Sequence, residues 1–152
     1  MNKLSPKQIA WLIPLFYLLH LSDEYFAGAG FPLWFSGVFN VDLSGIDFII
    51  INSIGFVATV SIVILYNFNK LNSFVIAALG TLFFINGIIH LFASLFTMSY
   101  SPGTLTGILI YLPVGLLIFK KILPLVQEEK RMLSIAAGII IQIVVAVVAL
   151  NI

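Results

Sequence analysis

An imidazole and two carboxylic acids stand close together in an otherwise apolar segment, at His20, Asp23 and Glu24. Spacings of three and four residues place all three side chains on one side of an α-helix. Such groups bind divalent metal ions, and they also exchange protons near neutral pH. Because ionisable side chains inside a membrane span are costly, they mark this segment as a candidate functional site.

A later apolar segment carries a second polar pair, Asn86 and His90, again four residues apart. With His20 and Glu24, the second imidazole completes a set of two histidines and one carboxylate, which is a common ligand set of catalytic zinc. We therefore predict a bound divalent transition metal, with zinc favoured, and Asp23 as a further ligand or an orienting acid. The predicted metal ligands are His20, Glu24 and His90, and the predicted catalytic residues are Glu24, Asp23, Asn86 and Thr106.

The composition is that of a membrane protein. Hydrophobic residues make up 61% of the 152 residues and charged residues only 9%, and the mean hydropathy is +1.17. Soluble domains carry about 25% charged residues. The formal net charge of +1 leaves no basic surface for nucleic acid, and the lack of cysteine excludes thiolate nucleophiles and Cys-ligated metals.

Apolar runs and helix-start signals predict an all-α fold, a polytopic transmembrane helix bundle that forms a single domain over residues 1–152. Three pairs of residues mark helix starts: Ser5 with Gln8, Ser44 with Asp47, and Ser101 with Pro102. About five spans are predicted, at about 6–28, 46–67, 73–97, 102–123 and 132–150. The aromatic and Gly-rich connection at 29–40 is predicted to lie at the membrane interface or to re-enter the membrane.

With five spans, every lysine and arginine falls on the same side of the membrane. By the positive-inside rule that side is cytoplasmic, so the N-terminus is expected in the cytoplasm and the C-terminus outside it. We expect an integral protein of the cell membrane, and a homo-oligomer fits this layout as well as a monomer. The basic residues are Lys3, Lys7, Lys70, Lys120, Lys121, Lys130 and Arg131.

The polar residues fall at similar depths in this arrangement. From the rise of an α-helix, His20 and Glu24 lie roughly 16 and 22 Å above the inner edge of the hydrocarbon. Asn86 and His90 lie roughly 18 and 24 Å above it, and Thr106 lies about 6 Å below the outer edge. Polar groups from helices that run in both directions are therefore expected to meet in the outer leaflet half.

Three segments resemble, in order and in residue type, signatures of the HXXEE-domain family. Residues 20–24 match HxxEE, residues 86–90 match NxxxH, and residues 102–106 match PGxxT. The family consists of small integral membrane proteins of unknown function, so the resemblance implies a membrane location and supplies no reaction. Asp23 stands where the family motif has Glu, which puts this carboxylate on a shorter side chain.

Three kinds of function are compatible with these residues. The first is a metal-dependent, hydrolase-like enzyme that acts on a lipid-like substrate within the membrane. The second is a metal-free acid/base isomerase of a sterol-like lipid, and the third is a proton- or cation-coupled transporter or binding protein. A fourth interpretation is purely structural, because the same polar groups can hydrogen-bond one another and hold the helices together.

Overall fold

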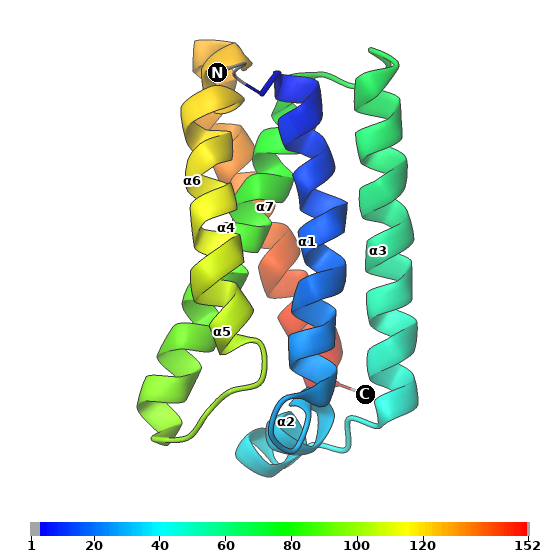
Figure 1. The fold of residues 1–152 in the computed structure, drawn as a ribbon, viewed down its shortest axis with the longest axis vertical. Coiled ribbons are helices and arrows are strands. Elements are labelled where there is room, and N and C mark those ends of the chain that lie inside the picture. Colours follow the sequence, from blue (N-terminus) through cyan, green and yellow to red (C-terminus); the bar gives the residue numbers. More distant parts are fainter. Residues whose placement is uncertain (1–3, 152) are drawn as a thin grey trace.

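The computed structural model describes residues 4–151, and these residues form helices and connecting turns without a strand. Lys3 lies outside the described residues. The helices are α1 (Pro6–Phe26), α2 (Phe31–Phe39), α3 (Gly45–Asn67), α4 (Ser73–Thr97), α5 (Thr104–Thr106), α6 (Leu112–Lys121) and α7 (Glu128–Leu150). A π-helical turn (Gly107–Tyr111) joins α5 to α6, and a 3₁₀ turn (Leu123–Leu125) follows α6. The long helices run side by side, with the two chain ends at opposite ends of the bundle (Figure 1).

Two of the predicted helix starts are confirmed. The Ser5 hydroxyl accepts a hydrogen bond from the Gln8 backbone amide, and the Gln8 side chain accepts one from the Ser5 amide, which forms the capping box. The Ser44 hydroxyl likewise accepts from the Asp47 amide at 3.1 Å. Asp47 therefore has a structural role in the first turn of α3, where its charge also complements the helix dipole.

Other predicted boundaries differ from the structure. The fourth apolar helix begins at Thr104 rather than at Pro102, because Ser101 is fully buried and its hydroxyl contacts His90 instead of capping a helix. The last helix begins at Glu128 rather than near residue 132. Its first turn contains the charged residues Glu128, Glu129, Lys130 and Arg131, which lie before the predicted span.

Four segments are long and apolar enough to cross a membrane: α3, α4, the stretch Thr104–Leu125, and α7. This confirms an all-helical, membrane-type bundle, and within the described residues length and composition identify four of the five predicted spans. The 21-residue α1 is not among them, since it carries the polar residues of the candidate site.

Helix α1 nevertheless runs beside α3 along the length of the bundle (Figure 1). At one end, the Lys7 ammonium group donates a hydrogen bond to the Asn67 carbonyl at 2.8 Å. At the other end, the Tyr25 ring lies 6.1 Å from the Phe48 ring in the first turn of α3. The two helices are therefore matched in length and level.

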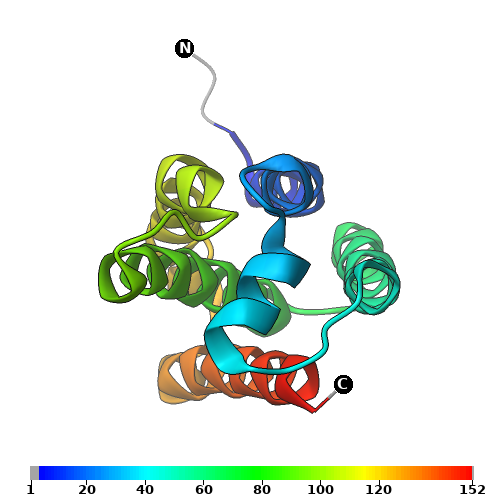
Figure 2. The ribbon, with the colours of Figure 1, turned by 90° about the horizontal axis from the view of Figure 1, so that it is seen from below.

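Helix α4 lies at the centre, with α1, α3, α6 and α7 around it (Figure 2). Two glycine contacts allow this close packing. A Cβ atom on Gly138 of α7 would collide with the Ala78 carbonyl oxygen of α4. A Cβ atom on Gly87 of α4 would lie 2.8 Å from the carbonyl oxygen of Gly107, in the π-helical turn. Small residues thus bring α7 and the fourth apolar helix against α4.

The π-helical turn ends at Tyr111, two residues before Pro113 in the first turn of α6. The Leu112 amide bonds to the Gly107 carbonyl, five residues earlier. Such turns are often found at functional sites because they rotate the side chains that follow them. Here the turn accompanies a buried Tyr111, whose ring stacks against His20.

The short helix α2 lies across one end of the bundle (Figures 1 and 2). It follows Gly28 and Gly30, both with positive φ, and ends at Asn40 in the left-handed conformation. The Trp34 indole donates a hydrogen bond to the Ser99 hydroxyl at 3.3 Å, which joins α2 to the turn after α4. This helix therefore covers the end of the bundle nearest the candidate site.

Candidate metal centre

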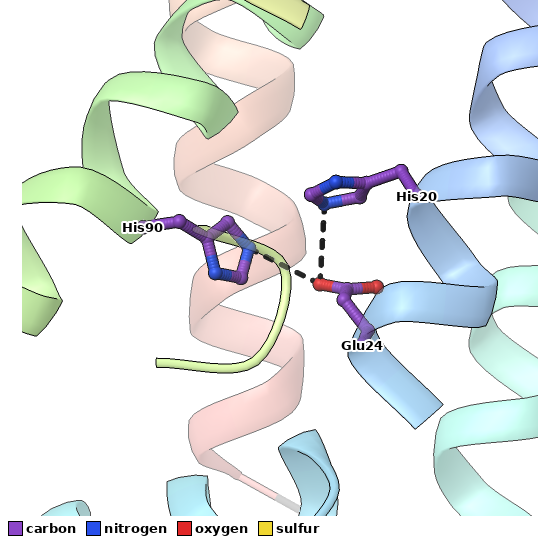
Figure 3. A group of neighbouring side chains, drawn as sticks. All are labelled: His20, Glu24 and His90. Carbon is purple, nitrogen blue, oxygen red and sulfur yellow. Dashed lines mark ion pairs between the residues drawn. The ribbon is translucent and has the colours of Figure 1, made fainter. Parts of the chain in front are cut away.

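His20, Glu24 and His90 meet in the interior of the bundle (Figure 3). Each of them is at least nine-tenths buried, with exposed fractions of 2%, 6% and 3%. Nε2 of His20 lies 3.5 Å, and Nε2 of His90 3.1 Å, from the same carboxylate oxygen, Oε1 of Glu24. The three potential ligand atoms all lie within 4.8 Å of one another.

The hydrogen bonds of Thr106 determine which nitrogen of His20 carries a proton. The Thr106 hydroxyl donates its single hydrogen to Oδ2 of Asp23, at 2.8 Å. The same hydroxyl oxygen lies 2.8 Å from Nδ1 of His20, so Nδ1 must be the donor in that contact. In the neutral imidazole, Nε2 then presents a lone pair toward the Glu24 carboxylate.

Asp23 supports this arrangement from behind His20. Its Oδ2 also accepts a hydrogen bond from the Thr106 backbone amide at 3.0 Å, and its Oδ1 accepts one from the Tyr100 hydroxyl at 2.8 Å. Burial and the hydrogen bond to Asp23 raise the pKa of Tyr100, which keeps the phenol protonated as a donor. Both carboxylate oxygens of Asp23 thus accept hydrogen bonds from the loop before α5 and from α5 itself.

His90 is oriented by a different part of the same segment. Its Nδ1 lies 3.2 Å from the Ser101 hydroxyl, which leaves Nε2 facing Glu24. Ser101 is itself held by its backbone amide, which donates to the Ser94 hydroxyl at 2.8 Å. The Thr104 hydroxyl also lies within hydrogen-bonding distance of the backbone carbonyl of His90. Both imidazoles are therefore fixed by hydrogen bonds on their Nδ1 sides.

Gly103 lies directly against the three residues. Its φ is +97°, and an added Cβ atom would lie 2.8 Å from the His90 ring, 2.9 Å from Cγ of Glu24 and 3.0 Å from the His20 ring. On the other side of His20, the Tyr111 ring stacks with its centroid 4.1 Å away. The site is therefore enclosed by the backbone at Gly103 and by an aromatic ring.

A cavity of about 390 Å³ adjoins the three residues. It is lined by side chains of α1, α2, α3, α4 and α7, and His20, Glu24, Asn86, His90 and Tyr111 are among them. Three buried polar atoms at its wall have no hydrogen-bond partner among the described residues: Nε2 of His20, Oδ1 of Asn86 and the Tyr111 hydroxyl. Buried polar atoms are usually paired, so a ligand or a buried water molecule in the cavity would satisfy these atoms.

The structure brings the predicted site residues into one region, where they fall into a group at the cavity and a group behind His20. His20, Glu24 and His90 form the central group, and Asn86 lines the cavity beside it. Asp23 and Thr106 do not line the cavity and instead bond to each other behind His20.

Sequence reasoning missed Ser101, Gly103 and Tyr111 as parts of the site. A signal for Gly103 was present in the PGxxT segment, whose first residue, Pro102, was assigned only to a helix start. The π-helical turn before Tyr111 left no recognisable pattern in the sequence.

The residues present fit a divalent transition metal. With ligand bonds of about 2.0–2.2 Å, donor atoms in a tetrahedral site lie roughly 3.3 Å apart, close to the two contacts of Glu24 Oε1. The Nε2 lone pair of His20 and the Glu24 carboxylate are both electron donors, and both face the same point. Imidazole and carboxylate donors suit zinc and its neighbours.

A buried His/Glu/His group, in a bundle with four apolar helices long enough to cross a membrane, defines a membrane-type protein with a candidate metal centre. The family described as "Protein of unknown function with HXXEE motif" matches residues 11–118, so the chain belongs to that family. The matched region contains all three motif segments, which the fold brings together around Glu24. No curated protein and no solved structure matches the chain.

Substitution of Gly103 by alanine is expected to destabilise the protein by about 1–3 kcal/mol, because alanine is strained at positive φ and its Cβ meets both imidazoles. Thermal unfolding in mild detergent measures this effect. Gly37→Ala in α2 is the matched control, since nothing lies within 4 Å of a Cβ atom there. Equal unfolding temperatures for the two variants would contradict the tight contact at Gly103.

Proposed function

We propose that this protein is a metal-dependent, hydrolase-like enzyme of the cell membrane that acts on a lipid-like substrate. His20, Glu24 and His90 would hold the metal, with zinc favoured by the donor set. A metal ion held there would polarise a substrate carbonyl or acidify a water molecule.

One observation carries the proposal. An unpartnered imidazole nitrogen and a carboxylate oxygen face each other inside an apolar bundle, 3.5 Å apart. Two electron-donating groups at that distance repel each other unless a cation or a proton lies between them. Because both imidazoles direct Nε2 toward the same oxygen, a single metal ion would satisfy all three side chains.

The remaining residues divide into two roles. Asn86 and Tyr111 face the cavity with unpartnered polar atoms, so we assign them to binding the polar part of the substrate. Asp23 and Thr106 act through His20, by holding its Nδ1 proton and its ring orientation. They are positioning residues in this proposal rather than groups that touch the substrate.

We further propose that α1 is a fifth span, with the N-terminus in the cytoplasm and the C-terminus outside the cell. The equal level of α1 and α3, shown by the Lys7 contact with Asn67, supports this. So does the chain direction, since the described ends lie at opposite ends of the bundle (Figure 1). The site would then lie in the outer leaflet half, with α2 at the outer interface.

A metal-free function is favoured by one feature of the same site. Both imidazoles contact a single carboxylate oxygen, and this arrangement suits proton sharing as well as metal binding. Acid/base isomerisation of a sterol-like lipid, or proton-coupled transport, would use these residues without a metal. The metal content of the protein decides between the two classes.

Protein purified without chelators is expected to contain about one equivalent of zinc or another transition metal, measured by elemental analysis. His20→Ala and His90→Ala should each lose it, because two remaining ligands bind a metal weakly. Gln142→Ala is the control, since Gln142 lines the cavity but lies outside the proposed ligand set. Folded wild-type protein that stays metal-free after incubation with zinc would contradict the proposal.

Thr106→Val is expected to lower metal affinity about 10- to 100-fold, because it removes the hydroxyl that links Asp23 to His20 while keeping the side-chain shape. Competition with a chromophoric chelator measures this affinity. Thr97→Val is the matched control, because the Thr97 hydroxyl bonds only within its own helix and the turn after it. Unchanged affinity in Thr106→Val would remove the positioning role.

The proposed orientation predicts opposite labelling of two single-cysteine variants, and the chain has no other cysteine. Met98→Cys, at a position 90% exposed after α4, should react with a membrane-impermeant maleimide on intact cells. Gln127→Cys, exposed before α7, should react only after the cells are permeabilised. The reverse pattern would invert the topology and place the site in the inner leaflet half.

A further inference from the structure

The cavity beside the metal centre is long as well as apolar. From the level of the metal centre, its wall on α4 continues from His90 to Leu79, and its wall on α3 continues from Asn52 to Ile62. Eleven and ten residues of α-helix correspond to about 16 and 15 Å along the bundle. At roughly 1.3 Å per bond, as in an extended backbone, this length accommodates a hydrocarbon chain of about twelve carbons.

The lining of the cavity differs on the two sides of its polar groups. The unpartnered polar atoms of His20, Asn86 and Tyr111 lie between the end covered by α2, which Phe31, Trp34 and Phe35 line, and the far end. The far end is lined by Ile62, Leu79 and Leu82, and Thr59 is the polar side chain nearest to Ile62 on α3. A ligand that matches this wall has a compact polar head and an apolar tail.

The walls on α3 and α7 suggest how such a ligand enters. Helix α3 packs chiefly on α1, and α7 packs chiefly on α4, so the two helices face each other across the cavity. Small residues line this part, with Gly55 and Ala58 on α3 and Ala146 and Ala149 on α7. The aromatic residues of α2 cover the end, so entry from the side, between α3 and α7, is the direct route from the bilayer.

We propose that the substrate is a single-chain lipid, whose polar head lies at His20, Glu24 and His90 and whose extended tail runs between α3, α4 and α7 toward Ile62 and Leu79. The assignment of the head rests on the proposed function of the metal centre. The chain site rests independently on the shape of the cavity. In the proposed orientation, the ligand lies as an outer-leaflet lipid does, with its tail toward the middle of the bilayer.

Ala58 allows a sharp test, because it lines the cavity about 9 Å, or roughly seven carbons, beyond the level of Asn52. We measure displacement of radiolabelled tetradecanol from the full chain in lipid nanodiscs, using protein treated with a chelator. Because the probe is neutral and the metal is removed, the result does not depend on the metal centre. Ala58→Phe should weaken tetradecanol binding at least about ten-fold, and it should weaken octanol binding by a smaller factor because the octanol chain ends at about the level of Ala58.

Val57→Phe is the matched control, since Val57 is 62% exposed, does not line the cavity and should leave binding unchanged. Ala58→Leu keeps the test open if the phenylalanine variant does not fold, and it should give a smaller loss in the same direction. Equal loss for octanol and tetradecanol, or equal effects at positions 57 and 58, would overturn the proposal. So would stronger displacement by cholesterol than by tetradecanol.

The two proposals can fail separately. Chain-length discrimination in protein that never binds metal would support the chain site and remove the metal-dependent function. Metal binding without discrimination between octanol and tetradecanol would leave the metal centre and overturn the single-chain ligand.

Discussion

The structure depends on the electrostatics of one buried carboxylate. Glu24 is buried, and the Nε2 atoms of His20 and His90 both face the same carboxylate oxygen, Oε1. A charge in an apolar bundle is costly unless neighbouring groups compensate it. The hydrogen bonds around the site do not supply this compensation by themselves, because Thr106 and Ser101 contact Nδ1 of each histidine and leave both Nε2 atoms facing Glu24. The surrounding fold thus directs two imidazole nitrogens and one carboxylate oxygen toward each other.

The segment between α4 and α6 does most of this positioning. Ser101 orients His90, Gly103 lies against all three central side chains, and Thr106 connects Asp23 to His20. Helix α1 contributes His20 and Glu24 to the site and α4 contributes His90. The loop and α5 contact side chains from both helices. Tyr111 belongs to the following π-helical turn and closes the site from the side. This explains why a segment with few charged residues carries one of the three family motifs.

Much of the bundle and the central residues of the site were predictable from the sequence. Apolar runs, capping residues and four-residue polar spacings are local signals. They predicted the helices and placed His20, Glu24 and His90 at similar depths in the membrane. The roles of Asp23 and Thr106 were not predictable in this way. They depend on which side of His20 the fourth apolar helix packs, and this follows from the contact between Gly87 and Gly107. Tertiary contacts of this kind have no periodic signature.

The sequence order of the site residues has a consequence for how the protein is made. Helix α1 is synthesised first and carries two of the three central side chains, whereas His90 and Thr106 come from segments that emerge much later. Until then, His20, Asp23 and Glu24 lack the partners that compensate them in the finished bundle. A helix with unpaired ionisable groups inserts poorly by itself. In the proposed five-span arrangement, stable insertion of α1 would therefore depend on the later arrival of α4 and α5.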